Sequence, residues 1–379
     1  MLKKNESSFF LFNTYIFIGE KMKFDKILFF TILVLGVFGI IMIYSASSIW
    51  ASFKFQDAFH YVKYQSIFFI IGIIIMIIVS KIPISFYYKN SNKILLLCII
   101  LLILVLIPGI GSIRNGSRSW FGIGSFGIQP SEACKIGLLI FVSKYLSNSE
   151  EDIKSIFRGV IPILFITFVI FGLIMLQPDF GTGFIIVCSI LALLFIAGCP
   201  ISFFIFGGVV GVIGVILLIL IAPYRMDRIT SFINPWSDAL GTGFQIIQSL
   251  YAIGPSGLLG MGYLNSIQKH FYLPEPQTDF IFSIICEEFG IIGVIFVLTL
   301  FGIILFRGIK ISINCSDSFS KYLSFGITFQ LLFQTALNLM VVVGLIPVTG
   351  VTLPFLSYGG SSLWISMISM GILLNISKT

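Results

Sequence analysis

Three carboxylates stand close together in a chain that otherwise carries little charge. Asp279 follows a turn at 273–278 that contains two prolines, and Glu287 and Glu288 lie two turns deeper in an apolar run. We expect Thr278 to cap a helix and Asp279 to lie in its first turn, where the helix dipole favours an ionised carboxylate. Such a group suits a base at a membrane edge, and acids within a membrane are functional candidates. A structural interpretation, in which Asp279 caps the helix and the two glutamates are paired, stays open.

Two further motifs place charge at the ends of apolar runs. Glu132 and Lys135 stand three residues apart at the start of one run, so they share a helical face. They are predicted either to pair with each other or to face a ligand. Asp179 lies in the short Pro- and Gly-containing turn 177–183, where a structural role is common, but the shortness of the turn holds it near bilayer depth.

Basic residues that suit phosphate lie in two predicted loops. The Gly- and Ser-rich stretch 109–120 carries two arginines, whose planar guanidinium groups match phosphate oxygens. The stretch 223–278 is the longest segment outside the apolar runs, and a loop of that length usually forms a site or a lid. The candidate cations of these two loops are Arg114, Arg118, Arg225, Arg228 and Lys269.

The composition predicts an all-α polytopic integral membrane protein. Of 379 residues, 57% are hydrophobic and 10% are charged, and the mean hydropathy is +1.07. We interpret residues 1–26 as an N-terminal segment and 27–379 as one membrane domain of about ten helices, with the large loop 223–278 between helices seven and eight. The ten apolar runs are 27–47, 65–80, 94–108, 132–146, 159–176, 181–198, 201–222, 279–306, 322–345 and 355–376.

The distribution of lysine and arginine predicts the orientation. With an even number of spans, 15 of the 23 basic residues fall on the side of the N-terminus, so both termini are expected in the cytoplasm. Residues 1–26 show no signal-peptide cleavage site. Met22 lies just before the first span, so translation starting at Met22, with residues 1–21 dispensable, is an alternative to Met1.

The uncharged stretch 344–362 lies between the last two apolar runs. Irregular backbone at membrane depth is tolerated only when it is buried or lines a cavity. We therefore expect a re-entrant hairpin that forms a wall of the site and contains Ser357.

Several classes of function are disfavoured. The net charge of +7 follows from the topology, and no basic run with interleaved aromatics indicates a nucleic-acid partner. The six cysteines show no C-x-x-C spacing, and the two histidines are far apart, so no metal centre or Ser–His–Asp hydrolase is expected. The mixed cations and carboxylates suit group transfer from a lipid pyrophosphate, with a base for the attacking hydroxyl.

Short sequence motifs from the first span to the last resemble those of the SEDS family (FtsW, RodA and SpoVE). The sequences around Asp279 and Val351 are most similar to the FtsW and SpoVE branch. The motifs begin at Ile43, Asn115, Gln129, Gln177, Asn234, Gln248, Gln268, Leu273, Glu287, Pro347 and Ser357.

The resemblance implies an inverting peptidoglycan glycosyltransferase that polymerises lipid II, works with a class B penicillin-binding protein transpeptidase and other divisome proteins, and serves septal synthesis. It implies that Asp279 is the catalytic base and that Glu132, Lys135 and Asp179 are functional. Arg118 and Lys135 are the first candidates for the pyrophosphate, followed by Arg114, Arg225, Arg228 and Lys269; Glu287, Glu288 and Ser357 are supporting residues. A divalent cation, Mg²⁺ or Mn²⁺, is compatible with this chemistry, although no ligand cluster requires one.

Three alternatives remain. A lipid II flippase would show a similar number of spans but should carry charge along a path through the bilayer. A RodA-type elongation polymerase would share the chemistry. A scaffold without catalytic activity would leave the clustered motifs unexplained.

Overall fold

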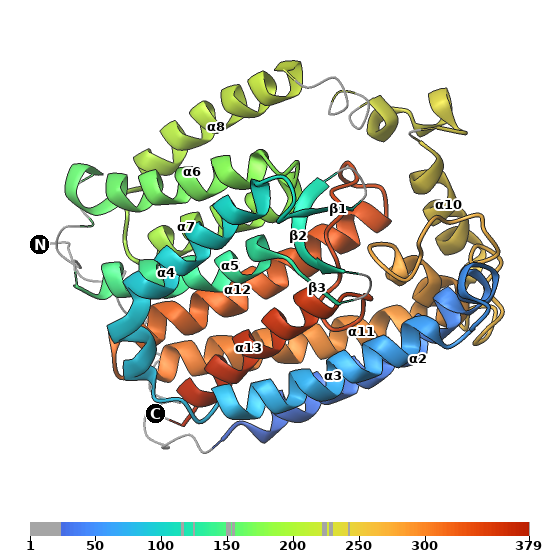
Figure 1. The fold of residues 1–379 in the computed structure, drawn as a ribbon, viewed down its shortest axis with the longest axis horizontal. Helices are drawn as coiled ribbons and strands as arrows, with labels where there is room; N and C mark the ends of the chain where they lie inside the picture. The colour runs from blue at the N-terminus through green and yellow to red at the C-terminus, as the bar shows by residue number, and fades with distance from the viewer. Residues whose placement is uncertain are drawn as a thin grey trace, which may run out of the picture.

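The computed structural model describes residues 24–114, 117–123, 126–148, 153, 156–221, 226, 230–241 and 243–378. Its helices lie side by side along one long axis (Figure 1). The backbone N–H of Asp25 donates to the hydroxyl of Ser377, so both ends of this described part meet at one end of the bundle, which we call the terminal end. A small sheet and α10 (Phe244–Ile253) lie toward the opposite end, the sheet end.

In the described residues, ten helices of at least 15 residues overlap the ten predicted apolar runs. Three of them begin five or more residues from the expected position: the second starts five residues earlier, the third starts ten residues earlier, and the last starts five residues later. The helices are α2 (Lys26–Phe55), α3 (His60–Val79), α4 (Ile84–Leu106), α5 (Pro130–Asn148), α6 (Ile161–Met175), α7 (Phe180–Ile196), α8 (Ile201–Ile221), α11 (Ile281–Asn314), α12 (Ser318–Val342) and α13 (Gly360–Ile376).

Six helical segments are long and apolar enough to cross a membrane, judged by length and composition over the described residues. They are α2, α3, α4, α11, α12 and the segment Arg158–Met175, which joins the π-helical turn η3 (Ile156–Val160) to α6. α7, α13 and the first part of α8 are shorter apolar helices. These features confirm a helical, multi-pass membrane protein, and the count of ten crossings stays a prediction.

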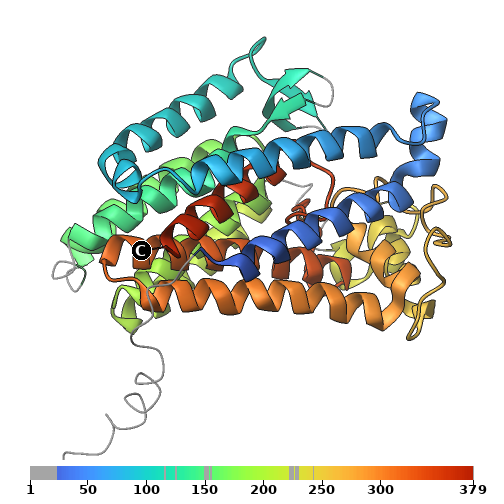
Figure 2. The ribbon, with the colours of Figure 1, turned by 90° about the horizontal axis from the view of Figure 1, so that it is seen from below.

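Packing inside the bundle is closest where large side chains are absent. α13 packs against α3, α4 against α5, and α11 against α12, as the view of Figure 2 also shows for α3 and α13. Gly39, near the middle of α2, lies so close to Phe355 that an added Cβ would stand 2.5 Å from the carbonyl oxygen of Phe355. Large apolar side chains such as Phe30 and Phe165 point outward, as a lipid-facing surface requires.

The stretch predicted as the loop 109–120 contributes to a three-stranded antiparallel sheet. β1 (Ser112–Arg114) pairs with β2 (Ser117–Ile123), and β2 pairs with β3 (Phe126–Ile128). Arg118 stands opposite Ile113 in this register, next to an irregularity of the β1–β2 pairing. The sequence analysis missed the sheet because its strands are short and interrupted by glycine.

The start of α11 differs from the prediction. The helix begins at Ile281 with Phe280 at the N-cap position, so Thr278 is not the cap and Asp279 lies just before the first turn. The hydroxyl of Thr278 instead donates to the carbonyl of Glu275 at 2.7 Å, which closes a separate turn. Local side-chain bonding of this kind competes with helix formation.

The predicted large loop 223–278 contains short elements in its described part. These are η4 (Pro235–Asp238), α10 and η5 (Gly254–Ser256). α10, with ten residues, is the longest of them. Arg225 and Arg228 lie outside the described residues.

Candidate functional site

Polar side chains recur every four residues along one face of α12. Gln330, Gln334 and Asn338 are all at least nine-tenths buried, and a four-residue spacing places them in one row along the helix. Each donates a hydrogen bond to a different part of the chain. This row, which we call the α12 polar row, organises the candidate site.

Lys135 and Glu132 form a buried ion pair at the start of α5. The ammonium nitrogen of Lys135 lies 2.8 Å from a carboxylate oxygen of Glu132 and donates to Oε1 of Gln334 at 2.7 Å. Pro130 begins the helix, where its missing N–H costs nothing. This start places Glu132 and Lys135 in the first two turns of the helix. The predicted pairing is therefore present, but in the interior, where the loss of one partner would leave an uncompensated charge.

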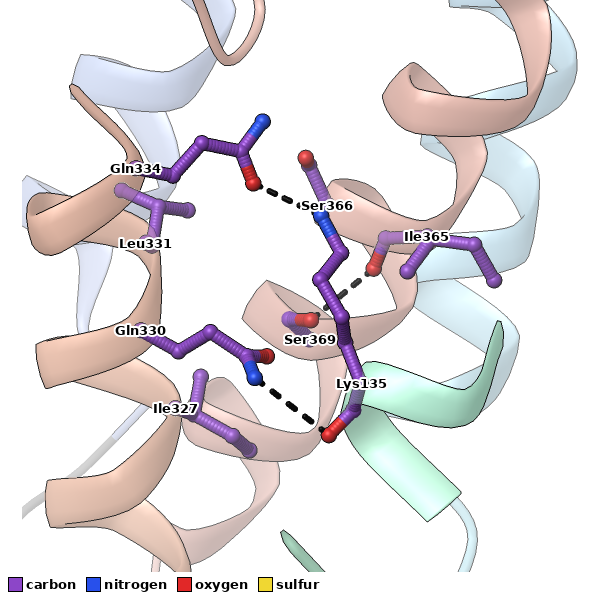
Figure 3. A pocket seen from close by; sticks show the side chains of 8 residues that line it. All are labelled: Lys135, Ile327, Gln330, Leu331, Gln334, Ile365, Ser366 and Ser369. Carbon is purple, nitrogen blue, oxygen red and sulfur yellow. Dashed lines mark hydrogen bonds between the residues drawn. The ribbon is translucent and has the colours of Figure 1, made fainter. Parts of the chain in front are cut away.

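A cavity of about 20 Å³ adjoins Lys135 between α5, α12 and α13 (Figure 3). In Figure 3 the Lys135 side chain reaches across it toward Gln334 and Ser366. This volume suits a water molecule and is far too small for a substrate. The lining residues are Lys135, Ile327, Gln330, Leu331, Gln334, Ile365, Ser366 and Ser369.

Asp279 lies at the sheet end, in the turn that precedes α11. Nδ2 of Asn338 donates to its backbone carbonyl at 2.7 Å, and the Thr278 hydroxyl donates to its Oδ1 at 3.0 Å. The residue is half-buried, and its backbone is anchored to α12. A carboxylate in this setting can accept a proton from a hydroxyl.

The segment 343–359, which makes up most of the stretch 344–362 predicted as a re-entrant hairpin, forms an irregular, hydrogen-bonded wall beside Asp279. Asn338 and Gln334 donate to the consecutive carbonyls of Val351 and Thr352, at 2.8 and 2.9 Å. The contact of Phe355 with the middle of α2 places the segment deep within the bundle. Ser357, the predicted supporting residue, is buried and accepts the backbone N–H of Leu353 at 2.8 Å.

Asp179 connects three elements. Its carboxylate caps α7 by accepting the N–H of Thr182 at 3.2 Å, and it also accepts from the side chains of Gln129 at 2.8 Å and Ser131 at 3.2 Å. The backbone N–H of Gln129 in turn donates to the hydroxyl of Ser361 at the start of α13. The structural interpretation of Asp179 therefore has direct support, and a role toward a ligand stays a prediction.

Glu287, Glu288 and Lys269 form a separate cluster between α11 and the chain that precedes it. Glu287 accepts from the backbone N–H of Ile267 at 2.8 Å and from the hydroxyl of Ser266 at 2.5 Å. Glu288 lies 3.0 Å from the ammonium of Lys269 and accepts the hydroxyl of Ser45. This pairing agrees with the structural interpretation of the two glutamates.

The helix break at Gly290 belongs to the same cluster. Gly290 has a φ of 59° and a ψ of −151°. Beside this break, the N–H of Gly262 in the preceding segment donates to the carbonyl of Glu288 at 3.0 Å. Tyr263 is the residue after Gly262. Burial, together with the nearby Glu288 carboxylate, raises the pKa of its phenol. The cluster therefore fastens the 257–269 segment to α11, and a pyrophosphate role for Lys269 stays a prediction.

The remaining predicted cations are less closely defined. Arg118 is half-buried on β2 at the sheet end. Arg114 ends β1, and its side chain, like Arg225 and Arg228, lies outside the described residues. The structure therefore joins Lys135 and Asp279 through α12 but does not relate these arginines to them.

The sequence analysis did not select Gln334 or Asn338 as site residues. The signal was present in the spacing of Gln330, Gln334 and Asn338 within an otherwise apolar run, because three large polar groups on one helical face need buried partners. The sequence did not indicate which residues those partners are.

The fold and site define a polytopic helical membrane protein with a charged, hydrogen-bonded site toward one end of its bundle. A family model described as Cell cycle protein (FtsW, RodA and SpoVE) matches residues 25–379. The chain belongs to this FtsW/RodA/SpoVE family, which confirms the resemblance.

Similar proteins support the same assignment. Stage V sporulation protein E of Bacillus subtilis is 49% identical over 359 residues, covering 95% of this chain and 98% of that protein. The probable peptidoglycan glycosyltransferase FtsW of Trichlorobacter lovleyi is 39% identical, covering 94% and 93%.

Solved structures share the fold along most of the chain. A chain from a peptidoglycan synthase complex, studied for the coordination of polymerization and crosslinking, gives a TM-score of 0.77 at 29% identity, covering 93% of this chain and 97% of that one. The rod shape determining protein RodA of Thermus thermophilus gives a TM-score of 0.69 at 25% identity, covering 93% and 96%.

Proposed function

We propose that this protein is a peptidoglycan glycosyltransferase that polymerises lipid II into glycan strands at the outer face of the cytoplasmic membrane. Family membership and the names of the FtsW relatives support the activity. The observation that carries the site assignment is the α12 polar row, in which Gln334 contacts Lys135 and Asn338 contacts Asp279. It links a cation that suits a phosphate to a carboxylate that suits a base.

Asp279 is the general base in this proposal. A hydroxyl oxygen of the acceptor sugar attacks the anomeric carbon of the donor, its proton passes to the Asp279 carboxylate, and the bond from that carbon to the undecaprenyl pyrophosphate oxygen breaks. One displacement inverts the configuration at that carbon. Cations stabilise the charge that develops on the departing pyrophosphate. Lys135 and Arg118 are the first candidates, and Arg114, Arg225, Arg228 and Lys269 follow them.

A divalent cation, Mg²⁺ or Mn²⁺, would fit this site only with help from the substrate. No group of three or more His, Cys, Asp or Glu residues converges within the described part of the chain. Magnesium is often held by one or two carboxylates together with substrate phosphates, and Asp279 is the half-exposed carboxylate that suits this role. When bound, the cation would offset negative charge on the pyrophosphate.

The biological setting follows the family. We propose a multi-pass protein of the cytoplasmic membrane with both termini in the cytoplasm, a class B penicillin-binding protein as transpeptidase partner, further divisome partners, and a role in septal synthesis. The match to a peptidoglycan synthase complex supports the partnership. The identity of 49% to a stage V sporulation protein favours a second candidate role, peptidoglycan synthesis during sporulation.

The test is polymer formation from labelled lipid II by the purified full-length protein with its candidate transpeptidase. We expect glycan polymer from the wild type and at least about a 100-fold lower rate from Asp279→Ala, because a general base contributes at least that much. Equal rates from the two proteins would remove Asp279 as the base. Absence of polymer from the wild type would favour the flippase or scaffold alternative.

Asp57→Asn is the matched control. Asp57 is a half-buried carboxylate at the sheet end, and its hydrogen-bonded ion pair with Lys63, at 2.7 Å, lowers its pKa. Its substitution removes one negative charge from the same end of the bundle and should leave polymerisation unchanged. Thermal unfolding in detergent shows whether each variant is folded.

A further inference from the structure

Gln334 uses both ends of its amide to join two parts of the candidate site. Its Oε1 accepts the ammonium of Lys135 at 2.7 Å, and its Nε2 donates to the carbonyl of Thr352 at 2.9 Å. Gln334 is almost completely buried. Loss of these contacts would leave buried polar groups unpaired, which is costly.

Asn338, one helical turn farther along α12, also joins two parts of the chain, but through its amide nitrogen alone. Its Nδ2 donates to the carbonyls of Asp279 at 2.7 Å and Val351 at 2.8 Å. Because the rise is about 1.5 Å per residue, the two amides stand about 6 Å apart along the helix axis. The same helix therefore holds Lys135, the backbone of Asp279 and two adjacent carbonyls of the 343–359 segment.

A lysine needs such partners if its charge is to occupy one position. Its ammonium is a point charge on a flexible stem of four carbons, without the planar geometry of arginine. Glu132 supplies the counter-charge, and Gln334 supplies a neutral acceptor from another helix. The two contacts together restrict the ammonium in a way that the ion pair alone does not.

We propose that Gln334 is a positioning residue, which directs the Lys135 ammonium toward the pyrophosphate of a polyprenyl substrate, and that Asn338 positions Asp279 by holding its backbone carbonyl. The inference deepens the proposed function and rests on it. Gln334 does not touch the substrate and acts through Lys135, so its contribution must vanish when Lys135 is absent. Precise placement of this kind commonly accounts for large differences in rate.

A double-mutant cycle on the full-length protein in its complex tests this prediction. Affinity for undecaprenyl pyrophosphate is measured for wild type, Gln334→Met, Lys135→Met and the double variant. Methionine keeps the approximate volume of both side chains and removes their polar ends. We expect Gln334→Met to weaken binding roughly 10-fold in the wild-type background, because hydrogen bonds to charged groups are strong, and less than 2-fold in the Lys135→Met background.

Equal losses in both backgrounds would overturn the inference, because a general effect on structure would add to the loss of Lys135. Thr335→Val is the matched control: Thr335 is the adjacent buried polar residue of α12, and within the described part of the chain its hydroxyl bonds only to the carbonyl of Leu331 in its own helix, at 2.9 Å. It should bind as the wild type does.

A second variant keeps the test decisive if Gln334→Met unfolds. Gln334→Glu retains an acceptor oxygen for Lys135 and should bind within about 3-fold of wild type by the same argument. Loss of binding by folded Gln334→Glu would overturn the positioning role.

Kinetics test the Asn338 part and separate the inference from the proposed function. Asn338→Leu should lower kcat about 10-fold while KM stays within 2-fold, because it disturbs the base and not the cation; a change in KM alone would overturn its role. If the wild type binds undecaprenyl pyrophosphate without forming polymer, the proposed function fails, and the binding cycle still decides the role of Gln334.

Discussion

The ammonium of Lys269 lies 3.0 Å from a carboxylate oxygen of Glu288, and both side chains are almost completely buried. The pair joins the segment before α11 to the second turn of that helix, and Ser45 of α2 contacts both partners. A buried charge pair of this kind is costly to break and inexpensive to replace as a whole. The cluster therefore stabilises the contact between α11 and the segment before it. Replacing one partner and replacing both should differ in their effects on stability.

The first prediction concerns this pair. Lys269→Met leaves the Glu288 carboxylate buried without its counter-charge and should lower the free energy of unfolding by roughly 3–5 kcal/mol. The double variant Lys269→Met with Glu288→Leu should recover most of that loss, because no isolated charge remains. Thermal unfolding of the purified proteins in detergent measures both. A double variant no more stable than Lys269→Met would show that the pair is not the source of the stability.

The second prediction concerns the break in α11. Gly290 has a φ of 59° and a ψ of −151°, and an added Cβ would stand 2.5 Å from the backbone nitrogen of Gly260. Gly290→Ala should therefore destabilise the protein by more than the 1–3 kcal/mol typical of backbone strain alone, since the neighbouring atoms also belong to the backbone. Loss of the folded protein on size-exclusion chromatography, or a strongly lowered melting temperature, is the expected result.

Gly302→Ala provides the control on the same helix. Nothing lies within 4 Å of the position of its added Cβ, and the residue is exposed. Alanine is the better helix former, so this substitution should leave stability unchanged or raise it by up to about 1 kcal/mol. Equal destabilisation by Gly290→Ala and Gly302→Ala would refute the conformational argument.

The third prediction separates the two interpretations of Asp179. Asparagine caps helices as well as aspartate does, so Asp179→Asn should keep the bond to Thr182 and melt within a few degrees of the wild type. If the carboxylate charge also serves the reaction, polymerisation should fall roughly 10-fold or more, the size expected for one lost charged hydrogen bond. We expect this fall; wild-type polymerisation would reduce Asp179 to a structural cap.

Particular elements show why some features were predictable. The apolar runs specified the positions of the long helices, because a chain in lipid must satisfy its backbone within each helix. The same argument anticipated buried irregular backbone after α12, where the uncharged chain lies against Gly39 of α2. It failed for the sheet 112–128, whose residues carry weak strand signals, and for the start of α11, where a competing turn at Glu275 delays the helix by two residues.

Composition and local motifs are enough to indicate a helical membrane protein of the FtsW/RodA/SpoVE type and to select Asp279, Glu132 and Lys135, because both are properties of neighbouring residues. The groups that these three residues contact follow from the folded arrangement of the whole chain. Lys135 meets Gln334 across 199 positions of the chain, and Asp279 meets Asn338 across 59. Contacts over such separations depend on how α5, α11 and α12 pack, and the pattern along one helix specifies a polar face without specifying what that face meets.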